Sequence, residues 1–545
     1  MPTIEISKSD LLELIGKKLG DKELEEALEL AKSGIDSAEG DLLKIEVGDV
    51  NRPDLWSAEG LARELKLRLG IEKKEYEAKS SGCELKVDSK VKKARPFIAC
   101  AVVKNLNLND SAIKSIIQLQ EKLCESFGLK RKEVAIGVYD FEKIKWPITY
   151  TTFIPSKLSF VPLGASQELT LKEILQQHEK GIQYAGLLEH LKEYPVLIDA
   201  EKRVLSMPPI INSEHSGKVT EETKNVFVEA TGFSERFVIP ALNIIICALA
   251  DRGGTMESVS ITDGKKRVTP DLKRKGAEVN IDEANNILGL NLIPRQISSL
   301  LEKAGFETKQ SGKKLSVTYP AYRQDILDSR DVIEDIAISY GYGNFLPIVP
   351  EVFTIGKFSE ETELREKVSG LITGLGVQEI ATFTLTNRDE LFKKMKMKAK
   401  EALEIANPVS ATYSSVRSWL LPSLLEFLSK NKDEDYPQKI FEIGKCIEII
   451  NGEADDKLKL AFATAEKKAG FTETRQMLEW LAASLGIEIK IVPCEHESFI
   501  AGRVGKIIVH GREAGILGEI SPAVLSEWNI SMPVAGFELD LTELK

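Results

Sequence analysis

The chain has 545 residues, too many for a single hydrophobic core, and the usual domain size predicts roughly three to five domains. Its 43% hydrophobic and 29% charged residues are ordinary for a soluble globular protein. A net charge of −11 disfavours a long nucleic acid as the main ligand. The apolar stretch Ala241–Ala250 is too short to span a membrane. The N-terminus lacks the pattern of a signal peptide. We therefore expect a cytoplasmic protein with no membrane or DNA partner.

The first segment, residues 1–75, alternates short strands and helices. Asn51–Asp54 has the composition of a turn. Asp54 then suits the N-cap of a helix that carries leucines at helical spacing, and Gly70 suits the end of that helix. A turn followed by an amphipathic helix explains these residue types without a functional site.

Residues 90–262 follow a polar linker and mix apolar strands with one long helix near Ile113–Phe127. The stretch Leu205–Asn212 holds two prolines among apolar residues, and proline lacks the N–H that a central strand must donate. The stretch is therefore either an irregular pocket wall or a plain connecting loop, and the sequence leaves both open.

Residues 265–345 have the pattern of a compact α+β module, in which two short helices precede a strand as in many winged nucleic-acid-binding modules. The module holds 13 Lys/Arg against 11 Asp/Glu, and this near-neutral charge weakens a DNA-reading role. A proline-containing connector covers residues 346–357, and an α/β pattern follows over residues 357–545.

Carboxylates are concentrated in RQDILDSRDVIED (Arg323–Asp335). Asp331, Glu334 and Asp335 lie at i, i+3 and i+4, so a helix places them on one face, and Asp325 precedes that helix. Helix capping, with Asp328 as N-cap, explains the early acids but explains Asp335 poorly. The six cysteines are scattered and only five histidines occur, so a cation here would be a hard ion held by oxygen. From these residues alone, capping and cation binding both remain open.

Several motifs, in collinear order, resemble the β subunit of phenylalanyl-tRNA synthetase in its short archaeal form. They are NRPDLWSAEGLAREL (51–65), YRQDILDSRDVIEDIAISYGYGN (322–344), NPVSATYSSVRSWLLPSLL (407–425), FEIGK (441–445), GRVGKIIVHGREAGILGEISPAVL (502–525) and VAGFELDL (534–541). The resemblance implies a multidomain α+β fold: an N-terminal α/β module (1–75), a mixed α/β editing domain of the B3/4 type (90–262), a small winged-helix-like B5 module (265–345) and a class II synthetase-like antiparallel sheet with helices (357–545).

The resemblance also implies a ligase that joins phenylalanine to tRNA(Phe) with ATP as an (αβ)₂ heterotetramer. The α subunit carries the activation site, and the core in this chain is a catalytically silent copy, since no G-x-G-x-x-x-R occurs near its C-terminus. In the family, Mg²⁺ is bound at the contact with the α subunit, and the matching residues are Asp325, Asp331, Glu334 and Asp335.

The family places hydrolysis of mischarged Tyr-tRNA(Phe) in the middle domain, because an apolar pocket rejects an added hydroxyl only weakly. The matching pocket positions are Leu197, Ser206, Glu229 and Thr231, and the family more often has aspartate at the position of Glu229. No Ser-His-Asp or Cys-His set points to a covalent mechanism. Two alternatives are a stand-alone editing hydrolase, against which the synthetase-like core argues, and a non-catalytic tRNA-binding scaffold, against which the near-neutral module argues.

Overall fold

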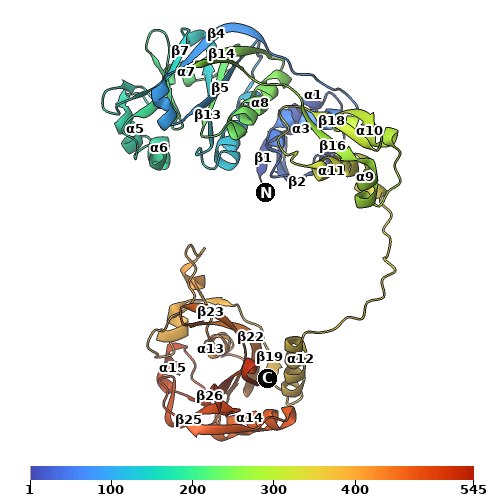
Figure 1. The fold of residues 1–545 in the computed structure, drawn as a ribbon. Helices are drawn as coiled ribbons and strands as arrows, with labels where there is room; N and C mark the ends of the chain where they lie inside the picture. The colour runs from blue at the N-terminus through green and yellow to red at the C-terminus, as the bar shows by residue number, and fades with distance from the viewer. Residues whose placement is uncertain (1, 545) are drawn as a thin grey trace. The chain divides into compact units, whose positions relative to one another are not determined.

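The structure is a computed structural model that describes residues 2–544. It divides into two compact units, of which the first ends at Val349 and the second begins at Pro350. Between them, Phe345–Ser359 forms no helix or strand, which is the stretch interpreted above as a connector (Figure 1). No helix in the described part of the chain has both the length and the apolar character that crossing a membrane requires.

The N-terminal module of the first unit is a three-stranded antiparallel sheet, ordered β1-β3-β2, covered by helices. Its elements are β1 (Thr3–Ser7), α1 (Lys8–Ile15), α2 (Asp21–Glu29), β2 (Ser33–Glu39), β3 (Leu42–Val47), a 3-10 turn η1 (Pro53–Leu55) and α3 (Ala58–Arg68). The expectation that Asp54 caps α3 is wrong, because Asp54 lies in η1 and the N-cap is Ser57, whose hydroxyl accepts from the Gly60 N–H at 3.1 Å. Gly60 permits this turn, since a Cβ there would collide with the Asp54 carbonyl oxygen.

The middle module is built on one mixed ten-stranded sheet, ordered β12-β11-β10-β7-β4-β14-β5-β13-β6, with β15 paired to β14. The strands are β4 (Lys79–Val87), β5 (Phe97–Lys104), β6 (Val134–Asp140), β7 (Ile148–Phe153), β10 (Tyr194–Ile198), β11 (Val204–Met207), β12 (Ile211–Asn212), β13 (Val226–Gly232), β14 (Thr255–Asp263) and β15 (Lys265–Thr269). Because Lys265–Thr269 belongs to this sheet, the sheet of the following module begins at Lys275.

Helices cover both ends of this sheet. They are α4 (Asp110–Lys122), α5 (Leu171–Gln177), α6 (Glu179–Tyr184), α7 (Glu214–Gly217) and α8 (Glu235–Asp251), with a short hairpin of β8 (Ser159–Phe160) and β9 (Leu169–Thr170) beside α5. The buried helix α8 packs across β5, β13 and β6 (Figure 1). Side chains along β13 alternate between the two faces of the sheet. Val226 and Val228 pack toward the helix, and Phe227, Glu229 and Thr231 point to the opposite face.

The third module of the first unit packs three helices against the antiparallel sheet β16-β18-β17. Its elements are β16 (Lys275–Asn280), α9 (Ile281–Leu288), α10 (Pro294–Glu302), β17 (Glu307–Ser311), β18 (Lys314–Tyr319) and α11 (Ser329–Tyr340). Asp328 is the N-cap of α11, as predicted, and Asp331 completes a capping box.

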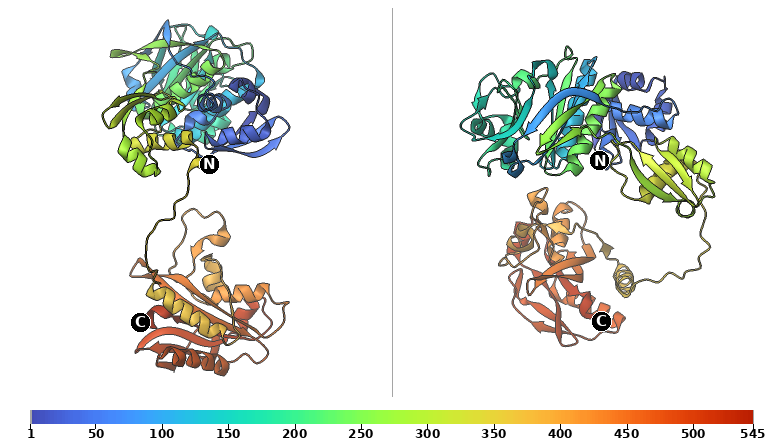
Figure 2. Two further views of the ribbon diagram at one scale, coloured as in Figure 1. Left: turned by 90° about the vertical axis from the view of Figure 1, so that its right-hand side faces the viewer. Right: turned by 45° about the horizontal axis from the view of Figure 1, so that its top comes forward.

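The second unit is a seven-stranded sheet, ordered β19-β22-β23-β27-β26-β25-β24, in which every pair except β19–β22 is antiparallel. Helices α12 and α14 pack on one face and α13 and α15 on the other; Figure 2 shows the gold helix α12 against the strands. Its elements are α12 (Glu360–Thr373), β19 (Gln378–Glu379), β20 (Leu385–Thr386), β21 (Ser415–Val416), α13 (Leu421–Lys430), β22 (Gln438–Ile450), β23 (Glu453–Ala465), α14 (Phe471–Leu485), β24 (Ile489–Pro493), β25 (Phe499–Val509), β26 (Arg512–Ile520), α15 (Pro522–Glu527) and β27 (Val534–Asp540). The whole chain is thus a mixed α/β multidomain protein with several sheets.

Candidate functional site

A cavity of about 670 Å³ lies beside the edge strand β6 of the middle module. Its lining is largely apolar and comes from α4 (Ile113 and Ile116), from β6 (Ile136 and Val138) and from the Pro208–Asn212 segment. The two prolines of that segment therefore belong to a cavity wall, one of the two alternatives that the sequence left open. The volume lies within the range of small-molecule pockets.

Glu229 is a buried carboxylate in the lining of this cavity, with 2% of its surface exposed. It lies on β13 opposite Gly137 of β6. The Tyr139 hydroxyl lies 3.0 Å from Glu229 Oε1 and 2.8 Å from Ser206 Oγ, and hydrogen-bonds to both. The other carboxylate oxygen, Oε2, is buried without a hydrogen-bond partner in the described part of the chain.

Burial raises the pKa of Glu229 to about 7, although the Tyr139 hydrogen bond and the Arg95 charge act to lower it. The carboxyl therefore changes its charge near neutral pH. A buried acid with an unpartnered oxygen at the edge of an apolar cavity is suited to accept one hydrogen bond from a bound ligand.

The other predicted pocket residues surround Glu229 without lining the cavity. Leu197 on β10 is the register partner of Ser206 on β11, and it packs in the same apolar cluster as Tyr139. Thr231 accepts from the buried Arg95 through both Oγ1 (3.1 Å, from Nε) and its carbonyl oxygen (2.6 Å, from Nη2). The structure thus joins Ser206 to Glu229 through Tyr139, and places Leu197 and Thr231 beside that pair.

Sequence reasoning missed Tyr139, Gly137 and Arg95. The strand VAIGVYD (134–140) puts Gly137 and Tyr139 on one face by simple alternation. Nothing local indicates that this face meets Glu229, because the pairing of β6 with β13 joins residues about 90 positions apart.

The carboxylates of RQDILDSRDVIED have separate partners. Asp331 accepts from the backbone N–H groups of Leu327 (2.7 Å) and Asp328 (2.9 Å), and so serves as a cap. Glu334 is half exposed and pairs with Lys32 of the N-terminal module. Asp335, which capping did not explain, is buried with 2% of its surface exposed.

Asp325 and Asp335 belong to a buried ion-pair network, called here the arginine joint. Arg323 binds Asp325 through two hydrogen bonds (2.8 and 2.6 Å) and Asp335 through one (2.8 Å). Arg68, on α3 of the N-terminal module, binds the other oxygen of Asp335. The full joint comprises three arginines and four acids: Arg52, Arg68, Arg323, Asp54, Glu64, Asp325 and Asp335.

The arginine joint links the two motifs NRPDLWSAEGLAREL and RQDILDSRDVIED within the first unit. Although burial acts to raise the pKa values of Asp325 and Glu64, the neighbouring arginine charges hold both below their usual ranges. Asp325 and Glu64 are therefore ionised, and all four acids of the joint are paired with arginine.

The four predicted metal ligands do not converge on one point in this arrangement, because each is already held by a partner within the chain. Asp325 and Asp335 accept from arginine, Asp331 accepts from backbone, and Glu334 pairs with lysine. Throughout residues 2–544, no group of three or more His, Cys, Asp or Glu side chains is arranged to hold a metal ion. Magnesium binding by these four residues stays a prediction.

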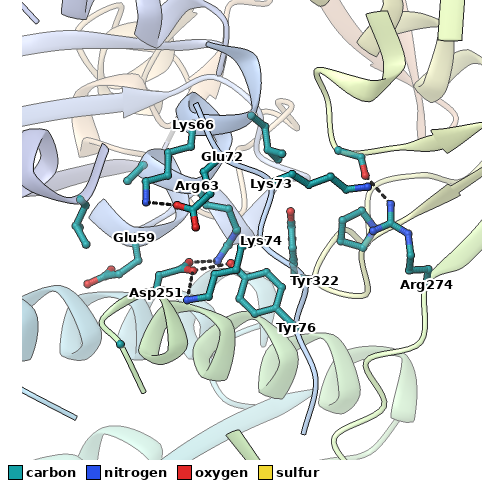
Figure 3. A pocket seen from close by; sticks show the side chains of 16 residues that line it. Glu59, Arg63, Lys66, Glu72, Lys73, Lys74, Tyr76, Asp251, Arg274 and Tyr322 are labelled. Carbon is teal, nitrogen blue, oxygen red and sulfur yellow. Dashed lines mark hydrogen bonds and ion pairs between the residues drawn. The ribbon is translucent and has the colours of Figure 1, made fainter. Parts of the chain in front are cut away.

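A smaller cavity of about 250 Å³ lies where α3 meets the segment 71–78 and the end of α8 (Figure 3). Arg63 pairs with Asp251 at 2.6 Å and stacks over the Tyr322 ring at 4.2 Å. Lys66 pairs with Glu72 at 2.8 Å, and Tyr76 also donates to Asp251. Arg63 and Lys66 are therefore already paired with acids of the protein. The cavity is lined by ion pairs between modules and does not offer these two side chains to an anion.

The second unit contains a cavity of about 660 Å³ over its sheet. Five acids line it against two lysines: Glu401, Glu448, Glu513, Glu538 and Asp540 against Lys400 and Lys459. Glu538 accepts from the backbone N–H groups of Leu420 (2.8 Å) and Leu421 (3.0 Å). This acidic surface repels a triphosphate.

Comparison with known proteins extends over the whole chain. Residues 98–241 match the "B3/4 domain", residues 277–342 the "tRNA synthetase B5 domain" and residues 347–541 the "Phenylalanyl tRNA synthetase beta chain CLM domain". The chain is 45% identical over 555 residues to the phenylalanine–tRNA ligase beta subunit of Pyrococcus abyssi, with 100% of each chain covered. It is 43% identical over 570 residues to that of Thermococcus kodakarensis, with 100% of this chain and 99% of the relative covered.

Among solved structures, the crystal structure of an N-terminal fragment of the phenylalanyl-tRNA synthetase beta subunit from Pyrococcus horikoshii matches with a TM-score of 0.61 and 45% identity. It covers 63% of this chain and 100% of its own. These findings confirm the resemblance that the collinear motifs indicated: the chain belongs to the family of phenylalanine–tRNA ligase β subunits.

Proposed function

We propose that this chain is the β subunit of a phenylalanine–tRNA ligase, which with an α subunit attaches phenylalanine to tRNA(Phe) at the expense of ATP in an (αβ)₂ heterotetramer. The observation that carries the proposal is identity at 45% over the full length of relatives that bear this name. Full-length similarity also argues against a stand-alone editing hydrolase. The acidic cavity of the second unit supports placing amino-acid activation on the α subunit, because ATP is a polyanion.

We further propose that the middle module hydrolyses Tyr-tRNA(Phe). The supporting observation is Glu229, which lines an apolar cavity large enough for a tyrosyl group and whose oxygen Oε2 has no hydrogen-bond partner in the described part of the chain. The tyrosine hydroxyl donates to Oε2 and satisfies it. Phenylalanine has no such donor, so binding it leaves a buried oxygen unpaired, which costs about 1–3 kcal/mol.

The reaction needs only water as its second substrate. Water adds to the ester carbonyl carbon, the bond to the ribose oxygen breaks, and a proton passes to that oxygen, which yields free tyrosine and uncharged tRNA. Within this chain, Glu229 recognises the side chain and the apolar walls exclude bulk water. Backbone donors and groups of the tRNA assist the attack, since none of the named pocket residues is an activated nucleophile.

Co-expression with a candidate α subunit tests the first proposal. Phenylalanylation of tRNA is expected from the purified α–β complex and from neither chain alone. Charging by this chain alone, or failure to form a stable complex, contradicts the assignment.

Glu229→Ala in the α–β complex tests the editing proposal. We expect hydrolysis of preformed Tyr-tRNA(Phe) to fall while phenylalanine charging is largely retained. Glu179→Ala is the matched control, because Glu179 is an exposed acid that lines the same cavity from α6. Equal loss of both activities in Glu229→Ala contradicts an editing role.

A further inference from the structure

The Tyr139 hydroxyl is the hydrogen-bond partner that the structure provides for the Glu229 carboxylate. The tyrosine is fully buried on β6, and its ring packs against Phe227 with centroids 5.6 Å apart. Its hydroxyl contacts both Glu229 and Ser206. A phenol carries one proton, so when Glu229 is ionised Tyr139 donates to the carboxylate and accepts from the Ser206 hydroxyl. The packed ring therefore fixes the position of the hydroxyl that contacts the carboxylate.

Gly137 leaves the space that this pair occupies. It lies opposite Glu229 on the neighbouring strand. A Cβ at position 137 would lie 2.6 Å from Glu229 Oε1 and would collide with the Tyr139 hydroxyl. The absence of a side chain at this point of β6 lets phenol and carboxylate meet beside the cavity.

The other ionisable groups near Glu229 do not replace Tyr139. Burial raises the pKa values of Cys100, on β5, and Tyr150, on β7, so both are neutral near pH 7. Arg95 is charged, but its guanidinium donates to Thr231 and to the Lys132 carbonyl. Arg95 therefore affects Glu229 through its charge, whereas Tyr139 makes the directional contact.

We propose that Tyr139 is a positioning residue for the editing reaction: its phenol holds one oxygen of Glu229, so that the other oxygen points to the tyrosine hydroxyl of the mischarged substrate. The inference rests on the proposed editing function. It adds a residue that does not touch substrate and that acts only through Glu229. Without the phenol, the carboxylate loses its orientation and the hydrogen bond that favours its ionised form.

Tyr139→Phe removes the phenol proton while keeping the ring. Because the lost hydrogen bond lowers the pKa of Glu229, that pKa rises in the variant and less carboxylate is ionised at neutral pH. We expect kcat/KM for Tyr-tRNA(Phe) hydrolysis near pH 7 to fall about ten- to hundred-fold, the range for a hydrogen bond to a charged group. The rise of activity with pH should move to higher pH, and phenylalanine charging should be unchanged.

Tyr150→Phe is the matched control. Tyr150 is equally buried in the same apolar cluster, but its hydroxyl donates to the Arg95 carbonyl at 3.0 Å instead of to Glu229. In this variant the pH profile of hydrolysis should stay in place. If the pH profile shifted in both variants, general loosening of the apolar cluster around Tyr139 and Tyr150 would explain the effect, and the proposal would be overturned.

A double-mutant cycle isolates the route through Glu229. Glutamine at position 229 does not titrate, so Tyr139→Phe added to Glu229→Gln should cause neither a further shift nor a further large loss. Independent, multiplying losses would overturn the positioning role. If Tyr139→Phe does not assemble with the α subunit, Gly137→Ala displaces the same contact while keeping both groups, and it should shift the profile in the same direction.

Failure of this inference and failure of the editing proposal give different results. If Glu229→Ala retains full hydrolysis of Tyr-tRNA(Phe), the editing proposal fails and the role of Tyr139 fails with it. If Glu229→Ala abolishes hydrolysis while Tyr139→Phe leaves rate and profile unchanged, the editing proposal stands and Tyr139 is only a core residue.

Discussion

Asp335→Asn should destabilise the first unit strongly, because Asp335 ties two modules together. Its carboxylate binds Arg68 of the N-terminal module and Arg323 of the third module. Removing one partner of a buried ion pair costs about 3–5 kcal/mol. After the substitution Arg68 still has Glu64 and Arg323 still has Asp325, so we expect the lower end, about 3 kcal/mol. A typical domain is stable by only about 5–15 kcal/mol.

Equilibrium urea unfolding of the full chain measures this loss, and hydrogen exchange of the α11 backbone amides locates it. Glu334→Gln is the control one residue away. Glu334 is half exposed and pairs with Lys32, so its substitution should cost about 1 kcal/mol or less. Both variants are measured with excess Mg²⁺ and with EDTA.

The reasoning fails if Asp335→Asn is no more destabilising than Glu334→Gln. It also fails if the loss at Asp335 is seen with Mg²⁺ and vanishes with EDTA, because a metal ligand then explains the residue better than the arginine joint. A loss that is the same in both solutions contradicts a metal-ligand role for Asp335.

Three further outcomes are expected. Gly60→Ala should lower the free energy of unfolding by about 1–3 kcal/mol, because the added Cβ collides with the Asp54 carbonyl, although alanine favours a helix more than glycine does. Thermal unfolding measures this loss, and an unchanged stability would contradict the close approach. The contribution of Glu229 to wild-type stability should fall by up to about 3 kcal/mol as pH rises from 4.5 to 7, because native Glu229 has a raised pKa of about 7 and must ionise while buried. Glu229→Gln should remove that component, so parallel stability curves would refute it. Glu538→Gln should cost about 1.5–3 kcal/mol in urea unfolding by weakening the charged acceptor of two N–H groups at the start of α13, and no change would contradict that role.

Local signals predicted local structure well in the carboxylate helix. The N-cap at Asp328 and the acid three residues later predicted where α11 begins, because both partners of a capping box lie within one turn. In the NRPDLWSAEG segment the same reasoning chose Asp54 instead of Ser57 as the cap. The error arose because Asp54 is held by Arg52 in a preceding 3-10 turn, and a short motif allows more than one helix start.

The sequence by itself determined the family, through motifs in collinear order, and the start of α11, through a cap. Tertiary structure decided what the individual acids do. Asp335 meets Arg68 across 267 positions and Glu229 meets Tyr139 across 90, so neither partner is visible from spacing. The physical reason is that a carboxylate's role depends on its burial and on the groups that contact it. Arginine makes Asp335 part of a buried ion-pair network, whereas burial raises the pKa of Glu229 to about 7 and a phenol holds one of its oxygens.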